Sequence, residues 1–184
     1  MMTPQRLNAM EIISEEYKRL TANPLINFGI TIRLFNDDNI FEWICTILGP
    51  RDSLYRGGLF FLKITFPFDY PNSKPEIIFL TPIYHLNVLY ANNGKYPLGH
   101  ISINILNNWK PGNSIIKIFP ELFTFMYKNN PEDPYDDIKH SRKNEFVNNR
   151  LLFDKKAEYF TKKYASSTKY QEYKNNWDFT YKSN

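Results

Sequence analysis

The stretch at residues 98–111, LGHISINILNNWKP, contains one serine, Ser102, that could serve as a nucleophile. A serine hydroxyl is a weak nucleophile unless a neighbouring base takes its proton. His100 lies two residues earlier and shares a face with Ser102 if the segment is extended. However, the sequence has no G-x-S-x-G motif, the pattern that presents a nucleophilic serine in many hydrolases. The sequence therefore disfavours a hydrolase built on Ser102.

Other side chains with reactive or metal-binding chemistry are scarce. Cys45 is the only cysteine, and its alternation with Trp43 and Ile47 predicts a buried, inert position on a strand. One cysteine cannot form an internal disulfide, so we expect a reducing, intracellular compartment, cytoplasmic by default, with an organellar assembly left open. Three histidines and one cysteine offer no metal-ligand spacing, so we expect neither a metal nor another cofactor.

Composition indicates one domain, alone or with tails. Hydrophobic residues make up 42% of the 184 residues and aromatic residues 17%, which is enough for a sizeable core. The net charge is +4, but lysines and acids are interspersed and no arginine-rich run occurs, which disfavours nucleic-acid binding. No window approaches the ~20 apolar residues that span a bilayer. We therefore expect no transmembrane segment, and the N-terminal residues lack the apolar core of a secretory signal.

The first half of the chain predicts a helix followed by four strands. In residues 6–20 apolar side chains recur at steps of three or four, and Pro24 ends the helix. Four runs of apolar residues then predict short strands, and the turn-rich connections between them favour an antiparallel meander. The apolar face of the helix would consist of Leu7, Met10, Ile13, Tyr17 and Leu20, and the strands would lie at 27–35, 41–48, 59–66 and 76–80.

The second half of the chain predicts a long loop and then helices. Residues 83–111 lack a clear period, and a loop of this length inside a compact domain is usually functional. Residues 113–127 look helical, with Ser114 as a candidate N-cap and Pro120 predicting a kink or a late start. A last helix is predicted at 141–165, which completes an α+β fold with segregated elements. Its buried stripe would consist of Val147, Leu151, Ala157, Phe160 and Tyr164.

Residues 166–184 form a polar tail that is rich in aromatic side chains. We therefore divide the chain into a domain at 1–165 and a tail at 166–184. Free polar tails are usually disordered. Two explanations for the aromatic residues stay open. The tail packs back on its own domain, or a partner orders it and uses aromatic side chains such as Trp177 and Phe179 as anchors.

Three motifs in the middle of the chain resemble those of ubiquitin-conjugating enzymes. A G-P-x-x-[ST]-x-Y-x-G-G turn begins at Gly49, an F-P-x-x-Y-P-x-x-x-P segment begins at Phe66, and residues 85–87 read His-Leu-Asn where the family has H-P-N. The motifs occur in the family's order, and the resemblance covers roughly residues 6–165. It implies the family's α+β fold: an N-terminal helix, a four-stranded antiparallel meander, a long active-site-like loop and C-terminal helices. The element order above agrees with it.

The resemblance also implies roles for individual residues. Enzymes of this family carry ubiquitin or a relative as a thioester on one cysteine, and Ser102 stands at that position. Asn87 corresponds to the asparagine thought to stabilise the oxyanion. Asp133 corresponds to the acid that assists the incoming lysine, and His85 to a structural histidine. The partner-binding side chains would be Phe66, Trp109 and Pro111, which resemble a ligase-binding surface, together with Trp177 and Phe179 of the tail.

Several features of the site depart from the family pattern. Ser102 lies 17 positions after His85, more than the family usually needs, and Trp109 follows seven positions later, one fewer than typical. Leu86 replaces the proline of H-P-N, and Pro120 interrupts the following helix. An engineered mutant would differ at one position, whereas here several have changed. We therefore predict a catalytically inactive variant of the family that acts as a binding or scaffold subunit, including within a larger assembly.

The alternative is an active, divergent conjugating enzyme whose nucleophilic cysteine was replaced by Ser102 by design. The survival of Asn87 and Asp133 favours it. In a dead site, Asn87 would merely hydrogen-bond the long loop and Asp133 would cap or turn its segment. Enzymatic activity is thus left open, with its absence favoured. The expected partners are proteins in either case: ubiquitin or a ubiquitin-like protein, a conjugating or ligase partner, or a multisubunit complex.

Overall fold

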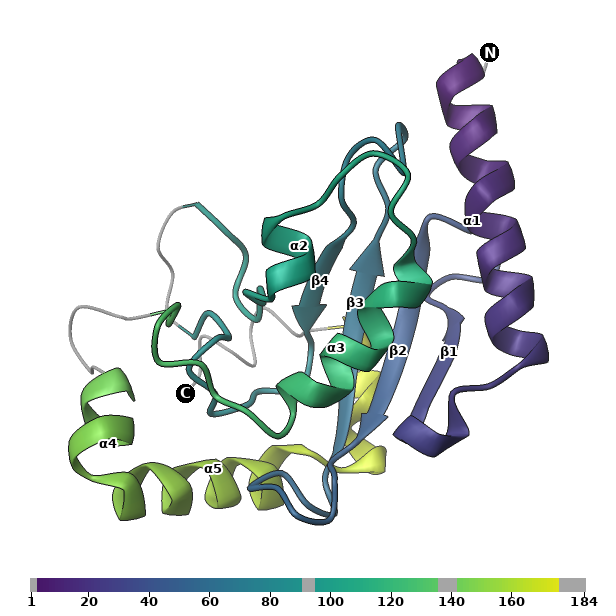
Figure 1. The fold of residues 1–184 in the computed structure, drawn as a ribbon. Coiled ribbons are helices and arrows are strands. Elements are labelled where there is room, and N and C mark those ends of the chain that lie inside the picture. Colours follow the sequence, from purple (N-terminus) through teal and green to yellow (C-terminus); the bar gives the residue numbers. More distant parts are fainter. Residues whose placement is uncertain (1–2, 91–94, 136–141, 176–184) are drawn as a thin grey trace.

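A computed structural model describes residues 3–90, 95–135 and 142–175 of the chain. Figure 1 shows a central sheet with α1 beside its β1 edge, α3 across one face, and α4 and α5 at one end. The elements in chain order are α1 (Pro4–Ala22), η1 (Ile26–Phe28), β1 (Ile30–Leu34), β2 (Glu42–Leu48), β3 (Leu59–Thr65), β4 (Glu76–Phe79), α2 (Asn104–Asn107), η2 (Ile115–Lys117), α3 (Ile118–Phe125), α4 (Arg142–Asn148), α5 (Arg150–Tyr164) and η3 (Ser167–Lys169).

The four strands form one antiparallel sheet in the order β1-β2-β3-β4, as the sequence predicted. Along β2, Trp43 pairs with Ile64 and Cys45 with Leu62, and all four side chains are buried in the main core. Burial raises the pKa of the Cys45 thiol, which keeps it protonated and inert. The long segment that follows β4 therefore lies against a tightly packed, rigid sheet.

Helix α1 buries most of the predicted stripe, since Ile13 and Leu20 are buried and Met10 and Tyr17 pack half-buried against the core. Ala9, Ile13 and Leu20 face the core together with Glu16, whereas Leu7 is 42% exposed. The Tyr70 hydroxyl donates to Glu16 Oε2 at 2.8 Å, and the Ser114 hydroxyl donates to Oε1 of the same carboxylate. Burial raises the pKa of Glu16. Hydrophobic periodicity cannot find a buried carboxylate, because its hydrogen-bond partners are far away in the sequence.

Pro120 marks the late start of a helix. A short η2 turn, in which the Ser114 side chain accepts from the amide of Ile116 at 3.1 Å, precedes α3. Helix α3 begins at Ile118, so Pro120 lies in its first turn, where the missing N–H costs no intrahelical hydrogen bond. The predicted cap and late start are both confirmed.

The predicted helix at 141–165 is two helices in the structure. Asn149 separates α4 from α5, and its side chain accepts from the amide of Leu152 at 3.2 Å as the N-cap of α5. The prediction that Val147 and Leu151 are buried is wrong, since they are 61% and 67% exposed. The break changes the helical phase, so that other side chains face inward. Ala157 and Tyr164 are buried as predicted, and Phe160 is half-buried.

The first part of the tail packs on the domain. Residues 167–175 are helical, and Tyr173 is fully buried against the sheet. For these residues the structure favours the first of the two explanations for the tail. Trp177 and Phe179 lie outside the described residues, and the domain boundary at 165/166 stays a prediction. Within the described residues, no helix is both long and apolar enough to cross a membrane.

Candidate functional site

Ser102 lies where the long segment after β4 folds against itself. Isolated β-bridges join Ile78 to His100 and Val88 to Ile101, and the amide of Ser102 donates to the carbonyl of Asn87 at 2.9 Å. The short helix α2 begins two residues later. Ser102 thus lies between an extended segment, which these bridges hold in place, and a helical turn. Its side chain is partly exposed.

The Ser102 hydroxyl belongs to a cluster of three side chains, which we call the Ser102 cluster: Ser102, Asn107 and Asp133. The hydroxyl donates to Asp133 Oδ2, and Asn107 Nδ2 donates to Ser102 Oγ at 2.9 Å and to Asp133 Oδ2 at 3.1 Å. Asn107 and Asp133 are exposed. The Asp133 carboxylate accepts a hydrogen bond from the serine, and a surface site of this kind is open to a macromolecule.

Asn87 holds the segment that carries Asp133. Its Nδ2 donates to the carbonyls of Asn130 at 2.9 Å and Asp133 at 2.7 Å, and its Oδ1 accepts from the amide of Asn130 at 2.7 Å. A primary amide has two N–H donors, and both are used here. Asn87 is also 2% exposed. In this arrangement it stabilises the 130–133 segment and has no free donor for an oxyanion.

His85 is a buried, neutral link beneath the site. The amide of Asn87 donates to its Nδ1 at 3.0 Å, so Nε2 carries the proton and donates to the carbonyl of Phe125 at 3.0 Å. The Phe125 ring stacks on the imidazole with centroids 4.0 Å apart. Burial, with a smaller contribution from the guanidinium of Arg142, lowers the pKa of His85 to about 3. Both ring nitrogens of His85 therefore bind backbone groups, those of Asn87 and Phe125.

Leu86, the departure from H-P-N, has a hydrogen bond that proline could not make. Its amide donates to Asn129 Oδ1 at 2.7 Å, and its carbonyl accepts from the amide of Tyr135 at 2.8 Å. The buried Arg142 donates to the carbonyls of His85 at 2.7 Å and Tyr135 at 2.8 Å. The sequence did not predict the roles of Asn107, Asn129, Asn130 and Arg142, because none of them stands in a recognisable motif.

His100 does not act as a base for the serine in this structure. It is 9% exposed, its Nδ1 lies 2.6 Å from the Tyr135 hydroxyl, and its ring stacks on Tyr96 with centroids 4.3 Å apart. Burial, with a smaller contribution from Lys74, lowers the pKa of His100 to about 4. Within the described residues, no group of acidic, histidine or cysteine side chains is placed to hold a metal ion.

The predicted partner-binding residues have different exposures. Phe66 is 2% exposed and packs against Trp43 and Tyr70, so its side chain offers no surface to a partner. Trp109 is half-buried, and its indole N–H donates to the carbonyl of Pro71 at 3.0 Å. Pro111 is exposed. Tyr70 packs against both rings, with centroids 5.1 Å from Phe66 and 6.0 Å from Trp109, so Phe66 supports this surface from the core rather than forming part of it.

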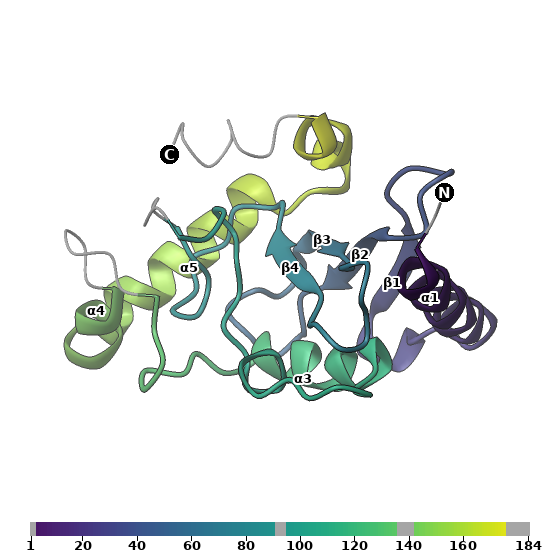
Figure 2. The same ribbon diagram turned by 90° about the horizontal axis from the view of Figure 1, so that it is seen from above.

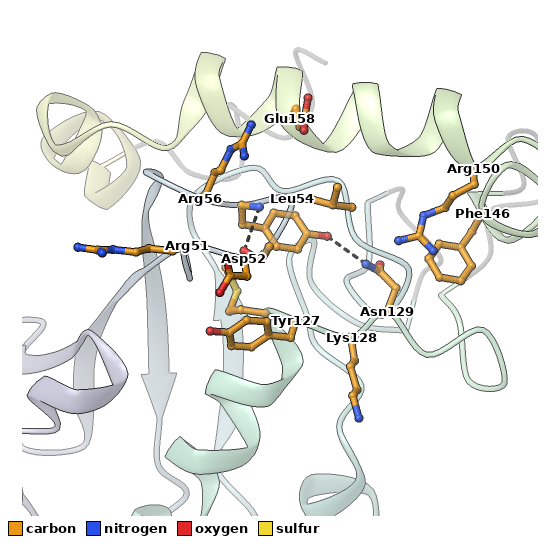
Figure 3. Close-up of a pocket in the computed structure, with 13 residues that line it drawn as sticks. Arg51, Asp52, Leu54, Arg56, Tyr127, Lys128, Asn129, Phe146, Arg150 and Glu158 are labelled. Atoms are coloured by element: carbon orange, nitrogen blue, oxygen red, sulfur yellow. Dashed lines mark hydrogen bonds between the residues drawn. The ribbon is translucent and has the colours of Figure 1, made fainter.

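A separate hollow of about 570 Å³ lies between the β2–β3 connection, the end of α3 and helices α4 and α5. Figure 3 shows that the side chains of Arg51, Arg56 and Arg150 point in different directions rather than toward a common point. Asn129 Nδ2 donates to the Tyr55 hydroxyl at 3.3 Å. Acidic Asp52 lies on the same wall. The hollow thus lacks the convergent charges of an anion site.

Replacing Asn87 with alanine should release the 130–133 segment. Three hydrogen bonds are lost and the Asn130 and Asp133 carbonyls lose a buried donor, so we expect the free energy of unfolding to fall by about 2 kcal/mol. Denaturant unfolding measures the loss, and hydrogen exchange should show faster exchange of the Asn130 amide. Asn108→Ala is the matched control, because that exposed amide bonds only within its own helical turn. Equal stability of the two variants would contradict this role.

Comparison with known proteins decides the family of this fold and site. Residues 12–161 match the family described as Ubiquitin-conjugating enzyme. The chain belongs to this family. It is 39% identical over 134 residues to a probable ubiquitin-conjugating enzyme E2 31 from Arabidopsis thaliana, covering 72% of this chain and 80% of the relative. It is 32% identical over 155 residues to ubiquitin-conjugating enzyme E2 14 from Schizosaccharomyces pombe, covering 84% of this chain and 93% of the relative.

Membership of the ubiquitin-conjugating enzyme family bears on the role predicted for Ser102. The family's thioester chemistry depends on a thiolate, which is both a good nucleophile and a good leaving group. Ser102, which the family motifs predict at the nucleophile position, donates to the Asp133 carboxylate, and the backbone carbonyl of Asp133 accepts from Nδ2 of Asn87.

Proposed function

We propose that this protein is a catalytically inactive member of the ubiquitin-conjugating enzyme family that works as a binding or scaffold subunit. One observation carries the proposal: the Ser102 hydroxyl donates to the Asp133 carboxylate, while Asn107 donates to both. An acid that assists an incoming lysine must be free to meet it. Here Oδ2 of that acid already accepts two hydrogen bonds, from Ser102 and from Asn107.

The chemistry at the site supports the same proposal. Transfer to lysine requires a reactive acyl group and a stabilised oxyanion. An ester on Ser102 would discharge poorly, because an alkoxide leaves less readily than a thiolate. Both N–H donors of Asn87 hold backbone carbonyls instead of facing the site. The protein is therefore suited to bind other proteins without forming an acyl intermediate on Ser102.

Protein partners follow from the family. The two relatives are named as ubiquitin-conjugating enzymes. We propose that the partner here is ubiquitin or a ubiquitin-like protein, a conjugating or ligase partner, or a multisubunit complex. The exposed loop at Trp109 and Pro111 is one proposed contact surface, and Trp177 and Phe179 are proposed as further anchors.

A second candidate is an active conjugating enzyme whose cysteine has been replaced by Ser102. The observation that favours it is that Ser102, Asp133 and Asn87 belong to one hydrogen-bonded network, in which a thiol could occupy the position of the hydroxyl. A cysteine codon at position 102 of the native gene would establish this second candidate.

A charging assay tests the proposal. The protein and its Ser102→Cys variant are incubated with activating enzyme, ATP and ubiquitin, and adducts are resolved with and without thiol. We expect no adduct on either form, because the surrounding site has also changed. Ser73→Cys is a matched control, since Ser73 also donates to a carboxylate, that of Asp69, at an exposed position. A thiol-sensitive adduct on folded Ser102→Cys but not on Ser73→Cys would overturn the inactive assignment.

A further inference from the structure

The outward side of helices α4 and α5 carries large apolar side chains that the fold leaves exposed. Figure 2 shows α4 at the opposite end of the molecule from α1, with α5 leading back from it toward the sheet. The inward side of α5 is buried through Phe153, Ala157 and Tyr164. The exposed apolar side chains are Val147, Leu151, Leu152 and Tyr159, with exposed fractions of 61%, 67%, 39% and 56%. The fold does not require these side chains, because an exposed helix position accepts polar helix formers equally well.

Lysines lie beside these apolar side chains at helical spacing. Lys155 follows Leu151 by four positions and Lys162 follows Lys155 by seven, so the three share one side of α5. Lys163 follows Tyr159 by four positions, and its ammonium lies 5.5 Å from the centre of that ring. We call this surface the α5 outer face, and it consists of Leu151, Leu152, Lys155, Tyr159, Lys162 and Lys163.

The charge of the α5 outer face is positive. Within the described residues, no acidic side chain forms an ion pair with Lys155, Lys162 or Lys163. Glu158 is an exposed acid on the same side of the helix, so three lysines and one acid leave a local net charge of +2 (3 − 1). A helix that combines a basic, exposed surface with apolar side chains is typical of binding at a membrane surface.

An anionic lipid surface fits the α5 outer face better than a protein does. A helix ridge is convex, whereas the residues that dominate protein binding usually sit in well-packed pockets. Lysine can bury its long stem and keep its ammonium among lipid headgroups, and tyrosine is enriched at membrane–water interfaces. A planar guanidinium would suit a protein carboxylate, but Arg150 of α5 already pairs with Asp154 at 2.6 Å.

We propose that the α5 outer face lies on the surface of a membrane that contains anionic lipids. Leu151 and Leu152 enter the boundary between headgroups and acyl chains, and the lysines contact the anionic headgroups. The contact is peripheral and reversible, because few apolar side chains and a modest charge take part. It goes beyond the proposed binding function and does not depend on Ser102. Its failure and the failure of the inactive assignment are therefore separate results.

Cosedimentation of the full chain with large unilamellar vesicles tests the proposal. We expect binding to vesicles that contain about 30% phosphatidylserine in phosphatidylcholine, and none to vesicles of phosphatidylcholine alone. Raising the salt concentration from about 0.1 M to about 1 M should release the protein, because salt screens exposed charges. Binding to both kinds of vesicle equally, or to neither, would overturn the proposal.

A pair of lysine variants tests whether α5 is the surface that binds. Lys155→Glu/Lys162→Glu should weaken vesicle binding at least about thirtyfold, because each lysine near an anionic surface contributes roughly fivefold. Lys110→Glu/Lys117→Glu is the matched control, since it changes two exposed lysines elsewhere and lowers the net charge by the same amount. Equal weakening in both variants would show that overall charge, rather than the α5 outer face, determines binding, and would overturn the proposal.

A leucine variant distinguishes a lipid surface from an acidic protein. Leu151→Ser removes apolar surface without a change in charge, and it should weaken vesicle binding roughly tenfold. Leu7→Ser is the control, because Leu7 is 42% exposed on α1, and it should bind as the parent does. Polyglutamate serves as the probe for an acidic protein. Binding to polyglutamate that requires the lysines but not Leu151, without binding to vesicles, would assign the face to an acidic protein and overturn the proposal.

Discussion

Replacing Arg142 with methionine should lower the free energy of unfolding by about 3 kcal/mol, because two charge-assisted hydrogen bonds to buried carbonyls are lost. Methionine fills much of the same volume but cannot donate, so the carbonyls of His85 and Tyr135 lose these donors. These two carbonyls flank the segment that carries the Ser102 cluster. Denaturant unfolding with an unchanged m-value would measure the loss directly.

Two further variants make the Arg142 result specific. Arg142→Lys keeps the charge but presents a single ammonium in place of a planar fork, so we expect an intermediate loss. Lys143→Met makes the same kind of change at the next, exposed position of α4 and should leave stability within about 0.5 kcal/mol of the parent. If Arg142→Met were as stable as Lys143→Met, the guanidinium would not be holding the site segment to α4.

The fold was largely predictable because its signals are local. Alternation in β2 and β3 follows directly from the two faces of a sheet, and the cap and proline around α3 act within one helical turn. The wrong predictions arose where one local sequence pattern was compatible with two different structures. The apolar residues at 141–165 fit one helix, but Asn149 caps a second one, which turned Val147 and Leu151 outward.

The site was only partly predictable, because its support comes from distant residues. Motifs pointed to His85, Asn87, Ser102 and Asp133, and the structure links these four residues through one hydrogen-bonded network. Motifs could not reveal that Asn129 binds the amide of Leu86, 43 positions away. An asparagine in a turn-rich segment usually serves its own turn.

Lowering the pH should destabilise the protein through His85. The pKa of His85 is lowered to about 3 by burial, so the unfolded chain, with an ordinary histidine pKa near 6.5, binds the extra proton first. Stability is therefore fully present above pH 6.5 and is lost as the pH falls toward the folded-state pKa. Linkage gives a loss on the order of 2.5 kcal/mol between about pH 8 and about pH 4.5. Urea unfolding at a series of pH values measures it.

Burial of the ring is the main cause of this loss, and the hydrogen bond at Nδ1 adds to it. Nδ1 accepts from the amide N–H of Asn87. Protonating Nδ1 would make it a donor that faces this N–H donor, and the hydrogen bond between them would be lost. His85→Gln should therefore flatten the pH dependence in this window, even if it lowers stability at pH 8. His100→Gln should flatten it by nearly as much, because the pKa of His100 is lowered to about 4, which also lies below this window. An unchanged slope in His85→Gln would show that His85 is not the group that titrates.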